Sequence, residues 1–244
     1  DLDYAEFDRM GAETPVLVDL KPSGAHYMED LNKAGGLAPV LRELADVLDL
    51  DCRTVSGRTL GEDLAAAPDP WPQTVVRPMS DPIYASGGMR MLTGNLAPNG
   101  AVIKQAAATP TLLKHTGRAV VFSSLEDLAN RIDDPDLDVT ADDILVLQNA
   151  GPASEAAMPE AGYLPIPKKL ARAGVKDMIR ISDARMSGTA YGAVVLHVTP
   201  DAATGGPLSL VQTGDQIRIS VKEKRLDLLV DEATLEKRRA ARSK

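Results

Sequence analysis

Cysteine, histidine and aromatic residues are scarce in this chain of 244 residues. The single cysteine, Cys52, excludes an intrachain disulfide, a paired-cysteine zinc motif and a cluster site with several thiolates from this chain. The three histidines, His26, His115 and His197, have no metal-ligand spacing. Aromatic residues make up 3% of the sequence, so little surface is available on which single-stranded bases could stack.

The chain also lacks an excess of positive charge and a long apolar run. Its net charge of −8 argues against nucleic-acid binding, which needs a basic face, and we expect the basic end "EKRRAARSK" to be a solvated helical tail. No apolar run reaches the roughly 20 residues that span a membrane. The first residues, "DLDYAEFDRM", have neither a basic start nor an apolar signal core. We therefore expect a cytoplasmic protein without a membrane partner.

The composition that remains is that of a globular protein, 44% hydrophobic and 25% charged. The first part alternates signals for a strand over 14–20 and helices over 37–48 and 57–64. The stretch 65–82 contains five prolines, which interrupt regular structure, and is the predicted domain boundary.

Short apolar runs separated by turn residues dominate the sequence beyond this stretch. They predict strands over 100–105, 117–123, 142–148, 176–182, 193–199 and 215–221. Helices are predicted over 124–132, with Ser124 as the cap and Asp127 at the capping-box position, and over 164–174 and 232–243. The segment 216–230 is typical of a hairpin. The pattern predicts an α/β chain whose second part is a β-rich barrel or sandwich.

Ser187 lies in "SDARMSGTAYG", a small polar turn between two apolar runs. A hydrolase nucleophile is disfavoured, because Arg185 occupies the first glycine position of the G-x-S-x-G pattern. The residues alone allow either a turn or capping serine or a functional hydroxyl.

Three further residues have a functional and a structural interpretation. Glu160, in "MPEAG", is either a ligand for a hard cation or a surface glutamate. Lys104, which ends "TGNLAPNGAVIK", either contacts an anion or simply follows a hairpin turn. His197 lies in an apolar run, which favours a core or supporting role over metal ligation.

Several motifs together resemble the family of dihydroxy-acid, phosphogluconate and sugar-acid (aldonate) dehydratases. They are "VLVDLKPSGAHYMEDLNKAGG", "TVSGRTLGE", "GNLAPNGAVIK", "VFSSLEDL", "MPEAGYLPIPKKLARAGVKDMIRISDARMSGTAYG", "LHVTPDAATGGPLSLVQTGDQI" and "RLDLLV". The sequences of these motifs are most similar to those of the arabinonate and xylonate dehydratases in the family. The resemblance implies that residues 1–64 are the α/β tail of an N-terminal domain, 65–82 a linker, and 83–244 a swivelling C-terminal domain with a β/β/α barrel-like fold.

The resemblance also implies a chemistry. Members of the family are lyases that remove water from a 2,3-dihydroxy carboxylate and give a 2-keto-3-deoxy acid. They use an iron–sulfur cluster, here implied to be of the 2Fe–2S type, and Mg²⁺. By the matching motifs, Ser187 is the base, Thr189 lies in the substrate pocket and Glu160 is a Mg²⁺ ligand. No cluster ligand is expected in this chain, and the enzyme is expected to be a homodimer or homotetramer.

The sequence departs from the family pattern at "ASEAA", Ala153–Ala157, where glycines and a lysine are usual. The cluster cysteines and the other Mg²⁺ ligands of the family belong to an upstream region, so we expect this chain alone to be inactive. The alternatives are a branched-chain dihydroxy-acid dehydratase and a non-catalytic or structural subunit.

Overall fold

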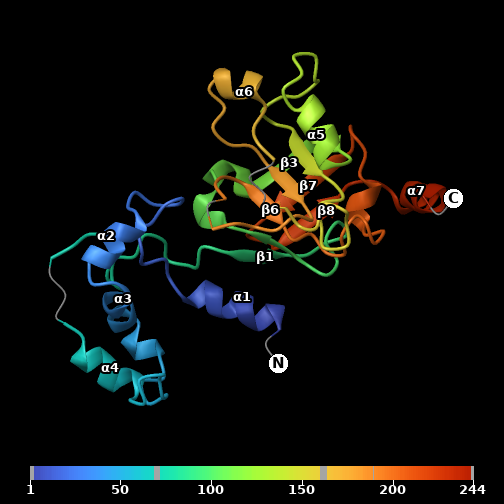
Figure 1. Ribbon diagram of the computed structural model, residues 1–244. Helices are drawn as coiled ribbons and strands as arrows, with labels where there is room; N and C mark the ends of the chain where they lie inside the picture. Colours follow the sequence, from blue (N-terminus) through green and yellow to red (C-terminus); the bar gives the residue numbers. More distant parts are fainter. Residues whose placement is uncertain (1–2, 69–71, 160–163, 189, 243–244) are drawn as a thin grey trace. The chain divides into compact units, whose positions relative to one another are not determined.

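The computed structural model describes residues 3–68, 72–159, 164–188 and 190–242. The chain divides into two compact units, Asp1–Gly88 and Met89–Lys244, which Figure 1 colours from blue to red along the sequence. None of the helices in the described ranges is long and apolar enough to cross a membrane.

The first unit consists mainly of short helices. They are α1 (Tyr4–Glu13), α2 (Met28–Lys33), α3 (Leu37–Glu43), the 3-10 turn η1 (Ala45–Val47) and α4 (Leu60–Ala66). The prediction of one helix over 37–48 is wrong in its length, because α3 ends at Glu43 and η1 follows. Leu37, at the start of the predicted helix, is 64% exposed and Val47, in η1, is 67% exposed, so burial does little to extend the helix.

The predicted strand over 14–20 forms isolated bridges rather than a continuous ladder. Val16 pairs with Tyr84 and Val18 with Val76. Val76, from the proline-rich stretch 65–82, is buried in this unit. The assignment of 65–82 as a boundary between domains stays a prediction.

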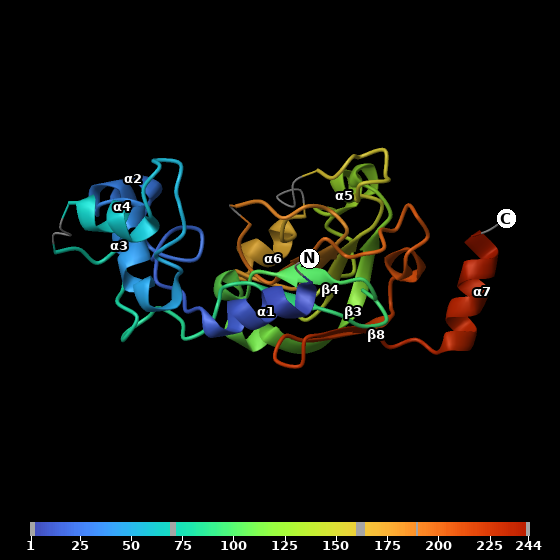
Figure 2. The ribbon, with the colours of Figure 1, turned by 90° about the horizontal axis from the view of Figure 1, so that it is seen from below.

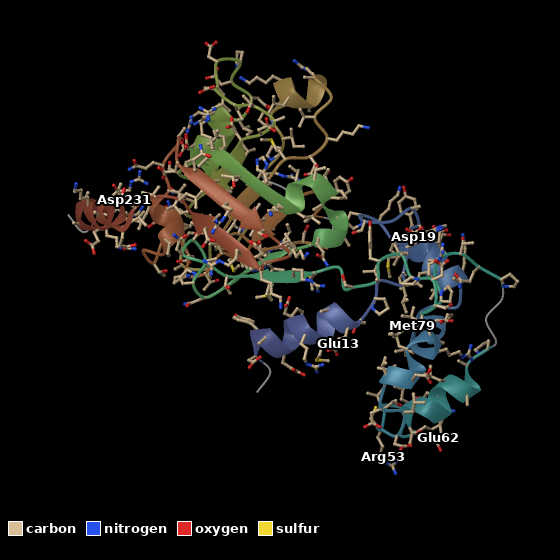
Figure 3. All side chains as sticks on the ribbon, turned by 180° about the vertical axis from the view of Figure 1, so that it is seen from behind. Glu13, Asp19, Arg53, Glu62, Met79 and Asp231 are labelled. Carbon is tan, nitrogen blue, oxygen red and sulfur yellow. The ribbon has the colours of Figure 1, made fainter. Side chains whose placement is uncertain are left out.

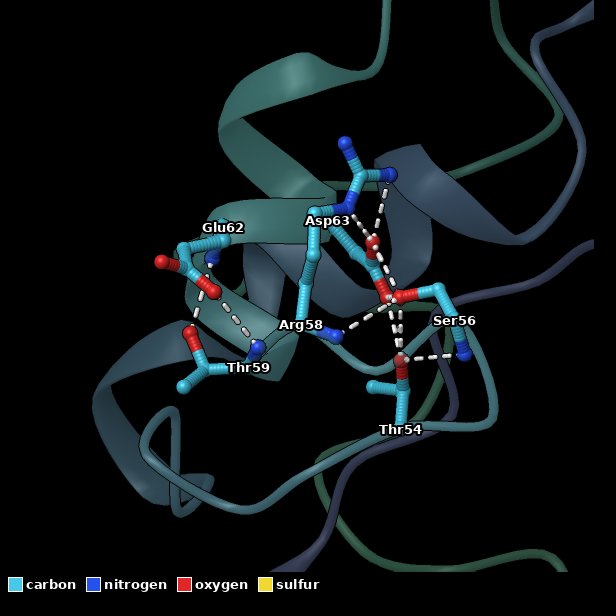
Figure 4. Close-up of polar contacts among 6 residues, drawn as sticks. All are labelled: Thr54, Ser56, Arg58, Thr59, Glu62 and Asp63. Atoms are coloured by element: carbon cyan, nitrogen blue, oxygen red, sulfur yellow. Dashed lines mark hydrogen bonds and ion pairs between the residues drawn. The ribbon is translucent and has the colours of Figure 1, made fainter.

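A polar network precedes α4, and Figure 4 draws it. The Asp63 carboxylate accepts hydrogen bonds from Thr54 Oγ1 (2.5 Å) and Ser56 Oγ (2.9 Å) and forms an ion pair with Arg58 (2.6 Å). The hydrogen bond from Thr54 contributes most to the lowered pKa of Asp63. These partners of the Asp63 carboxylate all lie within nine residues of it in the chain, which is the arrangement of a local structural brace.

The second unit is built on eight strands that form one sheet. In spatial order these are β1 (Arg90–Leu92), β2 (Ala101–Ile103), β6 (Val194–Leu196), β5 (Arg180–Ser182), β4 (Ile144–Leu147), β3 (Lys114–Phe122), β7 (Gln216–Ser220) and β8 (Arg225–Leu228). The pairs β3–β4, β4–β5 and β5–β6 are parallel, whereas the remaining pairs are antiparallel. A bridge between Thr93 and Arg225 joins the two edges, so the expected barrel-like α/β architecture is confirmed.

Both faces of the central strands are buried, as β4 shows. Ile144 and Val146 belong to the core enclosed by the sheet, and Leu145 and Leu147 to a second core outside it. Helix α5 (Leu125–Arg131) contributes Leu128 to this outer core and lies beside β3 (Figure 2). The continuous apolar runs of the sequence are therefore explained by burial on two sides.

Helix α6 (Lys168–Arg172), helix α7 (Glu232–Arg242) and the 3-10 turns η2 (Gln105–Ala107), η3 (Pro110–Leu113) and η5 (Pro207–Leu210) complete the unit. The predicted hairpin over 216–230 is confirmed as β7 and β8. The predicted turn before Lys104 is confirmed as the connection between antiparallel β1 and β2.

Short polar side chains cap several of the described helices. Thr59 begins α4 with a capping box. Asp231, labelled in Figure 3 beside α7, accepts hydrogen bonds from the N–H (2.9 Å) and hydroxyl (2.7 Å) of Thr234. Ser124 caps α5 as predicted, since its Oγ accepts from the Asp127 N–H at 3.1 Å. The Asp127 carboxylate, however, accepts from the N–H of Ser123, one residue before the cap.

Candidate functional site

The carboxyl ends of β3, β4, β5 and β6 lie at one edge of the sheet, because these four neighbouring strands are parallel. We call the loops that leave them the carboxyl edge. Ligand sites in parallel sheets form at this edge. The first residue after each strand is polar, and in strand order these residues are Ser123, Gln148, Asp183 and His197.

Asp183 joins two loops of the carboxyl edge. Its side chain is buried and accepts the N–H of Ala150 at 2.9 Å and the N–H of Ala202 at 2.8 Å. Burial raises the pKa of this carboxyl group, and the two N–H groups counteract that effect in part. With the residue 1% exposed, Asp183 holds the loops after β4 and β6 together rather than contacting a ligand.

Asp201 holds the start of the loop that leads to Glu160. Its carboxylate accepts hydrogen bonds from the N–H of Ala153 and the N–H of Thr204, each at 2.9 Å. Gly151 packs so closely that a Cβ there would lie 2.5 Å from the Asp201 Cβ, which explains the glycine. Burial alone would raise the pKa of Asp201, but the hydrogen bonds outweigh it and lower the pKa.

The unusual "ASEAA" segment has a left-handed backbone at its end. Ala157 and Met158 have φ values of 49° and 56°, which residues with a Cβ rarely adopt. Glu160, the predicted Mg²⁺ ligand, follows Met158 and Pro159 in the sequence but lies outside the described residues, as does Thr189. Their predicted roles stay predictions.

Ser187 lies in the loop after β5, half-buried, where it follows Met186. The N–H of Met186 donates to His197 Nε2 at 2.9 Å, and the N–H of His197 donates to the Ala184 carbonyl at 3.0 Å. Because Nε2 accepts, the ring proton of a neutral His197 resides on Nδ1. Burial first, and then the charge of Arg185, lower the pKa of His197 and favour this neutral form. His197 thus supports the serine loop.

Two cations hold the same loop by its carbonyl oxygens. Lys104 Nζ donates to the carbonyls of Ser187 (3.3 Å), Gly188 (3.1 Å) and Ala190 (3.3 Å). Arg180, on β5, donates to the Tyr191 carbonyl at 2.7 Å. The same guanidinium reaches the carbonyl of Leu164, at the far end of the Glu160 loop, at 3.3 Å. Arg180 therefore links the loop of the predicted metal ligand to that of the predicted base.

The described residues do not form a metal centre by themselves. No group of three or more histidine, cysteine, aspartate or glutamate side chains among them could hold a metal ion. Cys52 is exposed and is not part of such a group.

The chain matches the models of two domains of one protein family. Residues 74–244 match the model described as dihydroxy-acid/6-phosphogluconate dehydratase C-terminal, and residues 1–63 match the corresponding N-terminal model. The chain belongs to this family. The resemblance that the motifs indicated is thereby confirmed, and the family is one of dehydratases.

Relatives of this family member bear the names of sugar-acid and dihydroxy-acid dehydratases. L-arabonate dehydratase of Azospirillum brasilense is 48% identical over 240 residues, which cover 97% of this chain and 41% of that protein. 6-Deoxy-6-sulfo-D-gluconate dehydratase of Pseudomonas putida is 46% identical over 243 residues, or 98% and 42% of the two chains. Dihydroxy-acid dehydratase of Syntrophobacter fumaroxidans (strain DSM 10017 / MPOB) is 42% identical over 241 residues, again 98% and 42%. This dehydratase-family chain spans about two fifths of these relatives' length.

Proposed function

We propose that this chain forms the C-terminal part of a hydro-lyase that converts a sugar acid to its 2-keto-3-deoxy acid. The observation that carries the proposal is the Ser187 loop. It sits at the carboxyl edge of a dehydratase-family sheet, and Lys104, Arg180 and His197 all bind its backbone. A sugar acid is favoured over a branched-chain dihydroxy acid by the 48% and 46% identity to the two sugar-acid enzymes, compared with 42%.

In the proposed reaction Ser187 acts as the base. Its deprotonated hydroxyl accepts the proton from C2 of a 2,3-dihydroxy carboxylate, the C3 hydroxyl departs and is released as water, and the resulting enol tautomerises to the keto acid. The hydroxyl is a weak base at neutral pH, so Ser187 needs activation before it can accept the proton. A bound divalent cation can supply it, since it lowers the pKa of nearby hydroxyl groups.

The cofactors and partners are part of the same proposal. Glu160 would provide one Mg²⁺ ligand and Thr189 a substrate contact. The remaining Mg²⁺ ligands and those of an iron–sulfur cluster would come from the N-terminal part that the longer relatives have in addition. We further propose a homodimeric or homotetrameric enzyme located in the cytoplasm.

The substrate class is tested with the full-length protein that contains this chain, loaded with iron–sulfur cluster and Mg²⁺. Formation of 2-keto acid is compared for pentonates and for 2,3-dihydroxy-isovalerate. A site that binds the extra hydroxyl groups of a sugar acid should favour the pentonate by at least about 100-fold in kcat/KM. The reverse preference would assign the protein to the branched-chain enzymes instead.

The same assay separates an enzyme from a non-catalytic subunit. That alternative is motivated by the Ala153–Ala157 segment, whose last residue has a left-handed backbone. Protein with full iron, sulfide and Mg²⁺ content that converts neither class of substrate would contradict the proposed function. Conversion of a pentonate at a kcat of about 1 s⁻¹ or more would support it.

A further inference from the structure

The Lys104 ammonium group donates hydrogen bonds to the turn that contains Ser187. An ammonium has three N–H donors, and the three carbonyls of Ser187, Gly188 and Ala190 lie within 3.3 Å of Nζ. Among the residues that the structure describes, Lys104 forms no ion pair with a carboxylate. The half-buried lysine therefore brings a net positive charge to this turn.

Both ends of this contact are fixed by the barrel. Lys104 directly follows β2, which pairs with β6 through Ile103 and Val195. The N–H of Gly192, at the end of the serine loop, donates to the Ala107 carbonyl in η2 at 3.0 Å. Gly192 has φ 91°, and a Cβ there would lie 2.3 Å from Arg180 Nη2, so the loop returns to the sheet at a position that requires glycine.

The Ser187 carbonyl and the Gly188 N–H point to opposite sides of the serine turn. In a planar trans peptide, the carbonyl oxygen of one residue and the N–H of the next point in opposite directions. The Ser187 carbonyl faces Lys104, so the Gly188 N–H points away from it. The turn is closed by the Ala190 N–H, which donates to the Ser187 carbonyl at 3.3 Å. One cation thus sets the orientation of successive peptide groups around Ser187.

We propose that Lys104 is a positioning residue for Ser187, a role that rests on the function of Ser187 as base proposed above. The lysine orients the turn through three carbonyls and places a positive charge 3.3 Å from the carbonyl of the serine whose hydroxyl must become negative. Nearby positive charge stabilises an anion, and fixed orientation reduces the cost of reaching the reactive geometry.

The test uses the full-length, cofactor-loaded protein and the variants Lys104→Met and Lys104→Arg. Lys104→Met should lower kcat at least about tenfold per folded molecule, with KM changed less than about threefold. Lys104→Arg retains a charged donor and should recover most of the kcat. A second measurement is amide hydrogen exchange of the segment 183–192, which should become at least about tenfold faster in Lys104→Met and remain near the wild-type rate in Lys104→Arg.

Lys222→Met, at an exposed position in the β7–β8 turn, is the matched control and should change neither measurement. Wild-type kcat and exchange in Lys104→Met, or a loss that arginine does not restore, would overturn the proposal. If Lys104→Met does not fold, the amide exchange of segment 183–192 in Lys104→Arg is the deciding measurement. Exchange at the wild-type rate supports the positioning role of Lys104, and exchange that is about tenfold faster refutes it. Activity retained in Ser187→Ala would overturn the base assignment separately, without affecting the exchange measurement.

Discussion

Removing the Asp183 carboxylate should destabilise the barrel unit strongly. Asp183→Ala leaves the buried N–H groups of Ala150 and Ala202 without their acceptor. A buried polar group without a partner costs about 1–3 kcal/mol. Part of this cost is offset, because the variant no longer buries a carboxylate whose pKa is raised by burial. The expected decrease in the free energy of unfolding is about 3 kcal/mol.

Urea or thermal unfolding of the chain measures this change. For a unit of this size, about 3 kcal/mol corresponds to a decrease in Tm of roughly 6–12 °C. Asp142→Ala is the matched control, since Asp142 is exposed and lies just before β4, and its effect should stay within about 0.5 kcal/mol. An equally small effect for Asp183→Ala would refute the idea that this carboxylate holds the loops of the carboxyl edge together.

Three further changes in stability follow from backbone and charge. Ala157→Gly should leave stability unchanged or raise it by up to about 1 kcal/mol, because residue 157 has φ 49°. Ala156→Gly, by contrast, should lower the stability. Equal losses of stability for the two variants in urea unfolding would contradict the assigned strain. Gly192→Ala should cost at least about 2 kcal/mol in the same assay, and a neutral result would contradict the close packing. Burial alone would raise the pKa of Asp143, but the hydrogen bonds from Arg118 and from the N–H of Thr140, together with the Arg118 charge, outweigh burial and lower the pKa from its ordinary value of 3.8. The ionised form therefore stabilises the fold above pH 3.8, and this contribution is lost as the pH falls through the lower folded-state pKa. Asp143→Asn should thus lose much of its destabilising effect in acid, and an effect independent of pH between 7 and 2 would refute this.

The strands of the barrel can be predicted from the sequence because each is marked by its own residues and by the turns beside it. The run "DDILVLQ" identifies β4 through apolar residues that are buried on both faces, and turn residues mark where strands end. The helix over 37–48 is less well predicted, since Leu37, at its start, and Val47, near its end, remain exposed. Periodicity shows that a face is apolar, but not that another element covers it.

The candidate site is harder to predict because backbone groups provide most of its contacts. Asp183 binds N–H groups 33 and 19 residues away, and Lys104 binds carbonyls 83 to 86 residues away. N–H and carbonyl groups occur at nearly every residue, so no side chain marks these partners. The available signal for Asp183 is its polar position directly after a predicted strand. The motif around Ser187 depended on resemblance to the family.

The most direct measurement is the rate of keto-acid formation by Ser187→Ala in the full-length, cofactor-loaded protein. Ser80→Ala, an exposed serine in the first unit, is the matched control, and thermal unfolding verifies that both variants fold. General-base catalysis contributes about 10²–10⁴-fold, so we predict a loss of kcat of at least about 100-fold for Ser187→Ala and none for the control. A folded Ser187→Ala variant that forms keto acid at a rate within about threefold of the wild type would contradict the assignment of Ser187 as the base.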